Sequence, residues 1–282
     1  MPGLDLRLAV PRLPLPGETL PSAAPARASR AARGLNQAVV AARCGAEVRF
    51  CAPSATTLAE ANGSREVICG AKALPSSCCR GLAAPHGLFL LMVLPQGENS
   101  IVSTSACSLA LSACETEPAL KDLGEGDVVL LQGNLALDTT AFILDTAQRQ
   151  RATALFNPAP FWPGAEKLVA RCSLVIVNNV EARSLGAAIH DAKAALVTLG
   201  ADGCLLIERE DRRAFPAEIV GAIDTTGCGD TFCGVLAAAL ARGFHHRGRH
   251  WRGPEGRRPD GDPARRLSGP AVARELDAIL AV

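Results

Sequence analysis

The sequence predicts an α/β fold, a doubly wound, mostly parallel sheet with helices on both faces. Two observations lead to this prediction. Short, continuously apolar runs recur through the second half of the chain, and segments with helical spacing lie between several of them. Strands that are apolar throughout are typical of a parallel sheet covered on both faces. In such folds, ligands bind at the carboxyl ends of the strands.

The apolar runs give the strand positions in order along the chain. Strands are expected at residues 128–132, 154–157, 174–178, 194–199 and 203–207. The segments between them predict helices at residues 139–151 and 164–171 and a third that begins within 180–185.

The N-terminal third predicts fewer and shorter elements. A strand is expected at 4–10, followed by Pro- and Gly-rich turns. Residues 34–44 have helical spacing and end at Gly45, a residue typical of helix C-termini. A strand is expected at 48–51, and a hairpin is expected from strands at 88–94 and 100–104.

Composition limits the function classes. The 282 residues include 29 Lys and Arg and 28 Asp and Glu, so a net charge of +1 argues against nucleic acid and membrane surfaces as partners. Residues 88–94 form the longest strongly apolar run, which is too short to span a bilayer. Eleven cysteines without a C-x-x-C pair favour reduced thiols over structural zinc. With no signal-like segment at the N-terminus, these features predict a cytoplasmic protein.

Residues 1–282 are expected to form a single domain. Residues 243–266 are rich in Arg, His, Gly and Pro, which predicts an irregular segment. A short helix is expected after it, at residues 270–281.

The stretch from Ala222 to Gly243 carries the most chemical information: AIDTTGCGDTFCGVLAAALARG. Glycines before a helix let main-chain N–H groups converge on an anion, and the helix dipole favours negative charge there. Asp230 lies at the helix start, where a carboxylate could accept a proton from a hydroxyl that attacks a phosphoryl group. An acidic residue after a Gly-rich turn is equally compatible with an ordinary helix start.

The pattern D-T-T-G-x-G-D-T-F-x-G resembles the C-terminal signature of the ribokinase-like (PfkB) carbohydrate kinases. The resemblance implies that Asp230 is the catalytic base. It also implies that the amides of Gly227, Cys228, Gly229 and Asp230 form an anion hole for the transferring phosphoryl group. Asp224 and Thr226 match positions at which ribokinases hold a monovalent cation such as K⁺.

Further stretches resemble family motifs in the same order along the chain. They are P-G-E-T at 16–19, G-L-N-Q-A-V at 34–39, G-E-N at 97–99, N-P-A-P at 157–160, N-N-V-E at 178–181 and V-T-L-G-A-D-G at 197–203. The resemblance implies a sugar site that includes Asp5, Arg33, Gly34, Asn36, Asn134 and Asp230. It implies an ATP and Mg²⁺ site that includes Asn178, Glu181, Thr198, Gly200, Gly203 and Gly229.

The chain also departs from the family pattern. Ala31-Ala32-Arg33 stands where the family has G-G-K, Gly3 replaces an Asn, and Asn134 replaces a Glu. The family strand that would precede Asp5 is absent. Residues after Gly243 do not resemble the family's adenine pocket.

The implied function is ATP-dependent phosphorylation of a sugar hydroxyl, on ribose or a related carbohydrate, with Mg²⁺ and K⁺. The alternatives are another sugar or nucleoside kinase of the superfamily, or a degenerate, non-catalytic sugar- or nucleotide-binding pseudokinase. The resemblance further implies a small β-sheet lid from residues 4–20 and 88–104, and a homodimer.

Overall fold

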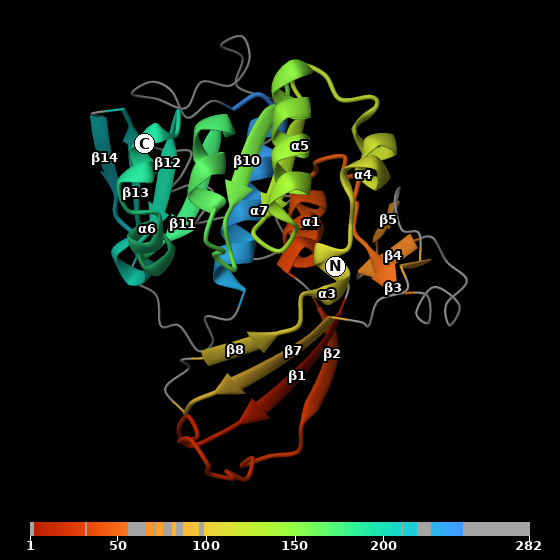
Figure 1. The fold of residues 1–282 in the computed structure, drawn as a ribbon. Coiled ribbons are helices and arrows are strands. Elements are labelled where there is room, and N and C mark those ends of the chain that lie inside the picture. The colour runs from red at the N-terminus through yellow and green to blue at the C-terminus, as the bar shows by residue number, and fades with distance from the viewer. Residues whose placement is uncertain are drawn as a thin grey trace.

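The computed structural model describes residues 3–31, 33–55, 66–69, 72–75, 81–82, 87–95, 99–209, 211–218 and 227–244. These residues form a six-stranded sheet covered by helices, and a four-stranded sheet that projects from it (Figure 1). Two short strand pairs lie beside them: β3 (Ser54–Ala55) with β6 (Gly81–Leu82), and β4 (Glu66–Cys69) with β5 (Lys72–Pro75).

The large sheet has the strand order β14-β13-β12-β11-β10-β9. Strands β9 to β12 pair in parallel, and β13 and β14 extend the sheet in antiparallel fashion. The predicted α/β class is therefore confirmed. The strands are β9 (Val128–Gln132), β10 (Thr153–Asn157), β11 (Leu174–Asn178), β12 (Ala195–Thr198), β13 (Cys204–Glu208) and β14 (Asp211–Phe215).

Helices cover both faces of the large sheet, because alternate strand residues point to opposite sides. On one face, Phe156 and Val175 pack with Leu144 of α5 and Val169 of η1. Each fully buried side chain of this kind contributes about 1.5–3 kcal/mol. The elements on this face are α5 (Leu137–Arg149), η1 (Ala165–Arg171), α6 (Asn179–Leu185) and η2 (Gly186–Asp191).

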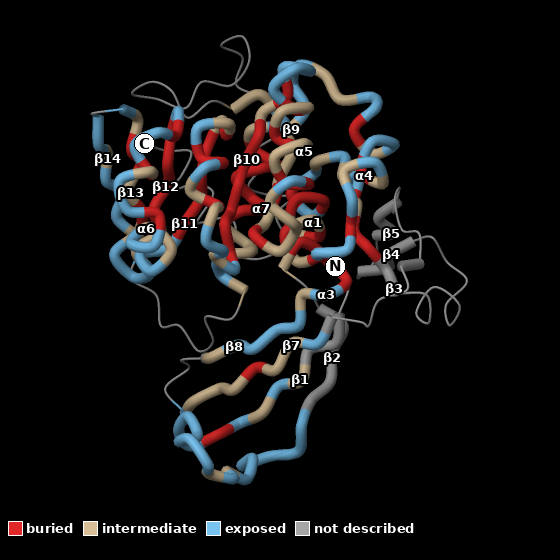
Figure 2. The backbone as a smooth tube through the Cα atoms, viewed as in Figure 1, coloured by how far each residue is buried: buried red, intermediate tan, exposed pale blue. Residues whose placement is uncertain are grey.

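The opposite face is covered by α7 (Cys228–Ala241), on which α1 (Arg33–Arg43) packs. Leu155 and Ile176 of the sheet pack in one cluster with Leu236 of α7. As Figure 2 shows, buried residues concentrate in the strands of the large sheet and the helices against it. The remaining helices are α3 (Ala106–Leu109), α4 (Ala113–Leu120) and η3 (Gly200–Asp202).

The small sheet has the order β2-β1-β7-β8, with β1 parallel to β7 and the other pairs antiparallel. Its middle strand β7 buries Leu91, whereas Ile101 and Val102 of β8 are exposed. The strands are β1 (Gly3–Ala9), β2 (Arg27–Ala31), β7 (Gly87–Val93) and β8 (Asn99–Ser103).

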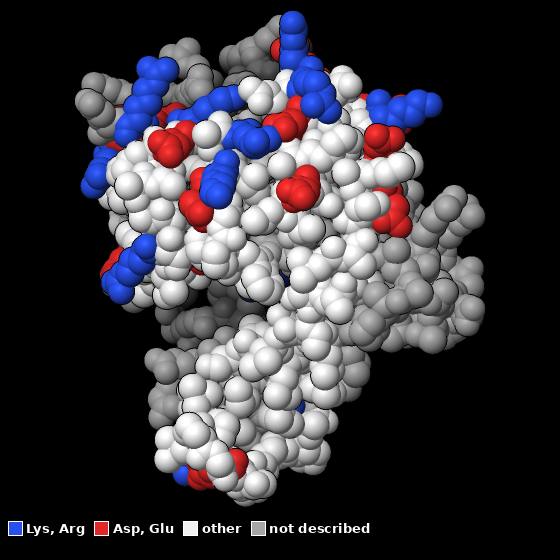
Figure 3. Space-filling view, viewed as in Figure 1, with Lys and Arg blue, Asp and Glu red and all other residues white. Residues whose placement is uncertain are grey.

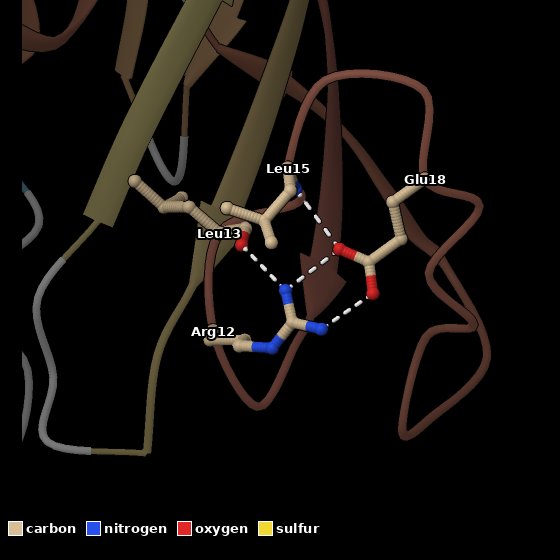
Figure 4. A network of polar contacts seen from close by, with 4 residues as sticks. All are labelled: Arg12, Leu13, Leu15 and Glu18. Carbon is tan, nitrogen blue, oxygen red and sulfur yellow. Dashed lines mark hydrogen bonds and ion pairs between the residues drawn. The ribbon is translucent and has the colours of Figure 1, made fainter.

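A polar network closes the loop between β1 and β2 (Figure 4). Arg12 forms a two-pronged ion pair with Glu18, and the Leu15 N–H donates to the same carboxylate at 2.9 Å. The hydrogen bond from Arg12 is the main reason that the pKa of Glu18 is lowered to about 2. Gly17 has φ +81°, a conformation that glycine adopts at low steric cost. The network therefore gives the expected P-G-E-T turn its shape.

The structure corrects several sequence predictions. Residues 48–51 do not form a strand, because Val48 and Phe50 pack on α1 while Phe50 alone makes an isolated bridge. Within residues 4–20, which were expected to contribute to a β-sheet lid, the described structure has the single strand β1, which pairs with β2 and β7. The segment at 164–171 is a 3₁₀ helix from Ala165, and β14 was not expected at all. Residues 245–266 and 270–281 lie outside the described residues.

Candidate active site

The four parallel strands end on polar residues at one edge of the large sheet: Gln132, Asn157, Asn178 and Thr198. The register aligns Gln132 with Asn157, and Asn178 with Thr198. Apolar side chains precede each of them, so the core gives way to hydrogen-bonding groups at this edge. The surface is hollowed between the helical part and the small sheet (Figure 3). The carboxyl edge is where α/β sheets bind ligands.

Asp230 lies in the first turn of α7, directly after a glycine turn. Gly227 has φ +82°, and its carbonyl accepts the first helical hydrogen bond, from the Thr231 N–H, at 2.8 Å. The N–H groups of the first turn therefore point out of the helix end, where the helix dipole is positive. Cys228 and Gly229 are exposed in this turn. The predicted anion-hole segment thus starts a long helix, as expected.

The Asp230 carboxylate is held by two side chains of α1. Asn36 Nδ2 donates to Oδ2 at 2.9 Å, and Gln37 Nε2 donates to Oδ1 at 3.1 Å. Burial is the largest influence on the group and raises the pKa of Asp230 above its ordinary value. The two hydrogen bonds and the positive charge of Arg33 oppose that rise. A partly desolvated carboxylate of this kind is a stronger base than an exposed one.

A second pair of amides lies behind this contact. Gln132 Nε2 donates to Gln37 Oε1 at 2.7 Å, and the Gln37 side chain is 1% exposed. Gly34 makes room for this pair, since a Cβ there would lie 2.8 Å from Gln132 Oε1. Neither Gln37 nor Gln132 was predicted as a site residue. The sequence did offer one indication for Gln37. It follows Asn36 directly and lies on the face of the predicted helix that carries the apolar residues.

Arg33 begins α1 and influences two carboxylates. Its charge lowers the pKa of both Asp230 and Glu181, so the guanidinium acts on the helix starts of α7 and α6 together. Burial is nevertheless the larger effect and raises the pKa of Glu181. Arg33, Asn36 and Asp230, which the sequence assigned to the sugar site, therefore lie near Glu181, which it assigned to the ATP and Mg²⁺ site.

Asn178 and Glu181 also cap the start of α6. The Asn178 N–H donates to Glu181 Oε2 and the Glu181 N–H donates to Asn178 Oδ1, both at 2.9 Å. This reciprocal pair is a capping box, which satisfies two donors at the helix end. The contact fixes the Glu181 carboxylate beside the carboxyl end of β11.

The next loop along the edge follows β12. Thr198 Oγ1 donates to the Val177 carbonyl at 3.4 Å, and Gly200 and Gly203 have φ +65° and +91°. A Cβ on Gly203 would lie 2.0 Å from the Phe215 carbonyl oxygen, so only glycine fits there. The three predicted nucleotide-site residues thus lie in one tight connection between β12 and β13.

The remaining predicted site residues are Asp5, Asn134, Asp224 and Thr226. Asp5 lies within β1 of the small sheet, opposite Ser29 and Phe89, and its side chain is not among the described groups. Asn134 lies in the turn after β9, two residues beyond Gln132. Asp224 and Thr226, the predicted cation ligands, lie outside the described residues.

Mg²⁺ prefers carboxylate and water oxygens. Within the described part of the chain, no group of three or more His, Cys, Asp or Glu residues gathers to hold a metal. Glu181 nevertheless fits a Mg²⁺ that is carried in by phosphates, because such ions take only one or two protein carboxylates. Its capping contact to the Asn178 N–H uses one carboxylate oxygen, Oε2.

The pfkB family carbohydrate kinase model matches residues 27–248, which include α1, α6, α7 and strands β9 to β12. The chain belongs to this family. It is therefore a carbohydrate kinase, an ATP-dependent phosphotransferase that acts on a sugar, as the motif predicted.

Relatives of this pfkB-family kinase agree with the assignment. It is 27% identical over 261 residues to the ribokinase of Haemophilus influenzae, covering 84% of this chain and 82% of that protein. It is 27% identical over 256 residues to the deoxyribokinase of Salmonella typhi, covering 83% and 81%.

Solved structures of the family show the same fold. The ribokinase of Thermotoga maritima superposes with a TM-score of 0.68 at 26% identity, covering 86% of this kinase and 84% of that chain. The ribokinase of Giardia lamblia gives a TM-score of 0.72 over 98% and 87% of the two chains, at 19% identity. None of the helices that the structure describes is long and apolar enough to cross a membrane.

Proposed function

We propose that this kinase transfers the γ-phosphoryl group of ATP to the primary hydroxyl of ribose or a closely related pentose such as deoxyribose. The observation that carries the proposal is the Asp230 carboxylate, which lies at the start of α7 and is held at both oxygens by α1. The substrate class is supported by the ribokinase and deoxyribokinase relatives, which match over most of the chain.

Asp230 acts as the general base. It accepts the proton of the sugar hydroxyl while the oxygen of that hydroxyl attacks the γ-phosphorus, and the bond to the β-phosphate oxygen breaks. Burial favours this role, because it raises the pKa of Asp230 and so increases the carboxylate's affinity for a proton.

The amides from Gly227 to Asp230 stabilise the transferring phosphoryl group. They lie at the positive end of α7, and donors fixed in place before the reaction stabilise developing charge without reorganisation. Arg33 adds a full positive charge close to Asp230 and Glu181. The sugar is held by Asn36 and Arg33 from α1, with Gly34, Asn134 and Asp5 as further candidates.

ATP lies along the carboxyl edge of the large sheet. Thr198, Gly200 and Gly203 line the nucleotide, and Asn178 and Glu181 face the phosphates with their Mg²⁺. When bound, Mg²⁺ neutralises phosphate charge.

Three further features belong to the proposal. Asp224 and Thr226 hold K⁺, the small sheet covers the sugar as a lid, and two copies associate as a homodimer. The enzyme works in the cytoplasm, the compartment that favours the reduced thiols expected from the sequence.

A coupled assay with a pentose, hexose and nucleoside panel tests the substrate proposal. Purified enzyme with ATP, Mg²⁺ and K⁺ should form ADP with ribose or deoxyribose at a higher kcat/KM than with hexoses or nucleosides. A nucleoside preference would support the nucleoside-kinase alternative. Ribose and ATP that raise Tm without any turnover would support the pseudokinase alternative instead.

A further inference from the structure

The Asp230 carboxylate has two oxygens in unlike surroundings. Oδ1 accepts from Gln37, whose side chain is 1% exposed, whereas Oδ2 accepts from Asn36, which is half-buried. Gln37 is itself held by Gln132 at the end of β9. Three elements that lie far apart in sequence thus meet in one line of hydrogen bonds, Gln132 to Gln37 to Asp230.

The donor direction along this line is fixed by the carboxylate. An ionised carboxylate can only accept, so Gln37 must turn its NH₂ group toward Asp230. Its carbonyl oxygen then faces Gln132, which must in turn present its own NH₂ group. The observed contacts have this order at 3.1 and 2.7 Å. Flipping either amide would bring two like groups together.

Gly34 adds a steric requirement to the same line. A Cβ on Gly34 would lie 2.8 Å from Gln132 Oε1 and 3.3 Å from its Cδ. The glycine therefore leaves space for the Gln132 amide on the side away from Gln37. This contact is independent of Asp230 and constrains Gln132 from the first turn of α1.

We propose that Gln37 and Gln132 are positioning residues that anchor Oδ1 of Asp230, so that Oδ2 is the oxygen that takes the substrate proton. Oδ1 is bonded to a buried amide and is withdrawn from the sugar. Oδ2 accepts from Asn36, which is half-buried and is itself a predicted sugar contact, so this oxygen is assigned to the substrate. The line sets the direction of the carboxylate and favours its ionised form. This inference rests on the proposed role of Asp230 as base.

The charge that acts on this carboxylate is Arg33 of α1, which lowers the pKa of Asp230. Arg33 also lowers the pKa of Glu181 in α6, and burial and the charges of Asp230 and Glu181 raise the pKa of Cys233 in α7. The Gln37 hydrogen bond also lowers the pKa of Asp230. Removing the Gln37 hydrogen bond should therefore raise the pKa of Asp230. The acid limb of the pH profile of kcat should then move to higher pH.

The test compares Gln37→Met, Gln132→Met and the double variant. We expect Gln37→Met to lower kcat about tenfold, with the sugar KM changed less than twofold and the acid limb moved to higher pH. Gln132→Met should also lower kcat and move the acid limb to higher pH, but by smaller amounts. Because Gln132 acts through Gln37, the double variant should match Gln37→Met. Gln148→Met, on the exposed surface of α5, is the matched control and should leave all three measurements unchanged.

A titration of the Asp230 carboxyl carbon by ¹³C NMR gives a readout independent of turnover. In Gln37→Met the midpoint of the Asp230 titration should move to higher pH. If Gln37→Met fails to fold, Gln132→Met decides the proposal, because Gln132 is only half-buried. A folded Gln132→Met enzyme with wild-type kcat, acid limb and titration overturns it, as do single-variant losses that multiply in the double variant.

Asp230→Asn separates this inference from the proposed function. If Asp230→Asn is inactive while the glutamine variants behave as wild type, the anchoring role alone is wrong. If Asp230→Asn remains active, the base assignment is wrong and the anchoring role with it.

Discussion

Gly234 of α7 lies directly against the main-chain carbonyl oxygen of Gln37 in α1. A Cβ at Gly234 would lie 2.6 Å from that oxygen and 2.8 Å from the Cβ of Val40. The two helices can therefore approach this closely only because residue 234 has no side chain. Their approach brings the Gln37 amide within 3.1 Å of the Asp230 carboxylate, one turn earlier in α7.

Gly234→Ala should reduce both stability and turnover. The added methyl group must push α1 away from α7, and overpacking of this kind costs about 1–3 kcal/mol of unfolding free energy. The same shift lengthens the contacts from Asn36 and Gln37 to Asp230, so kcat should fall at temperatures where the protein is still folded. Denaturant unfolding and steady-state kinetics measure the two effects.

Gly229→Ala is the matched control for stability. A Cβ there meets nothing within 4 Å, so the free energy of unfolding should not fall. Equal losses of stability in both alanine variants would contradict the packing explanation.

Asp230→Asn should lower kcat by about 10²–10⁴-fold, the usual contribution of a general base. The amide keeps the size of the side chain but cannot take the proton. ATP should still raise Tm in the variant, because the nucleotide loop after β12 is unchanged. Near-normal kcat together with intact ATP binding would rule out Asp230 as the base.

Arg33→Met should move the acid limb of kcat/KM to higher pH and lower its plateau by about 10–100-fold. The sign follows from the electrostatics: the Arg33 charge lowers the pKa of Asp230, so its removal lets that pKa rise and a higher pH is needed to ionise the base. Arg33→Lys keeps the charge and should retain the wild-type acid limb. An acid limb that is the same in all three proteins would contradict this account.

Glu181 has two proposed roles, capping the start of α6 and binding Mg²⁺, and they can be tested separately. Glu181→Gln retains an oxygen that can accept from the Asn178 N–H, and should keep the capping box and the wild-type Tm. It removes the charge, so the Mg²⁺ concentration needed for half-maximal rate should rise. Glu181→Ala should lose the cap as well, at a cost of about 1 kcal/mol. If Glu181→Gln shows the wild-type Mg²⁺ dependence, the carboxylate has no part in binding the metal.

The sequence predicted the four parallel strands almost to the residue, because each is a continuous apolar run, and β10 to β12 are largely buried. Strand β14 was missed for the opposite reason. Its residues Asp211–Phe215 lie on the edge of the sheet and are mostly exposed or half-buried, so they carry no apolar pattern. Residues 48–51 have a strand-like composition, but their apolar side chains are satisfied by packing on α1 rather than by pairing.

The site was predicted only in part. Asp230 and Asn36 belong to motifs that are read locally, and the structure joins them at 2.9 Å. The contact between Gln37 and Gln132 spans 95 positions and depends on how α1 meets the end of β9. No local pattern specifies such a pairing, because each glutamine taken alone is compatible with an exposed surface. The contact between Gln37 and Gln132 is set by how α1 packs in the folded protein.

The meeting of α1 with α7 also sets when the enzyme becomes able to act. Asn36 and Gln37 are made 194 and 193 residues before Asp230, and contacts between such distant positions form late in folding. A growing chain can complete the parallel strands β9 to β12 while α1 still lacks its carboxylate partner. The helix that closes the second face of the large sheet, α7, is also the helix that carries Asp230, the proposed base. A chain on the ribosome that ends before α7 therefore lacks the base of the proposed reaction.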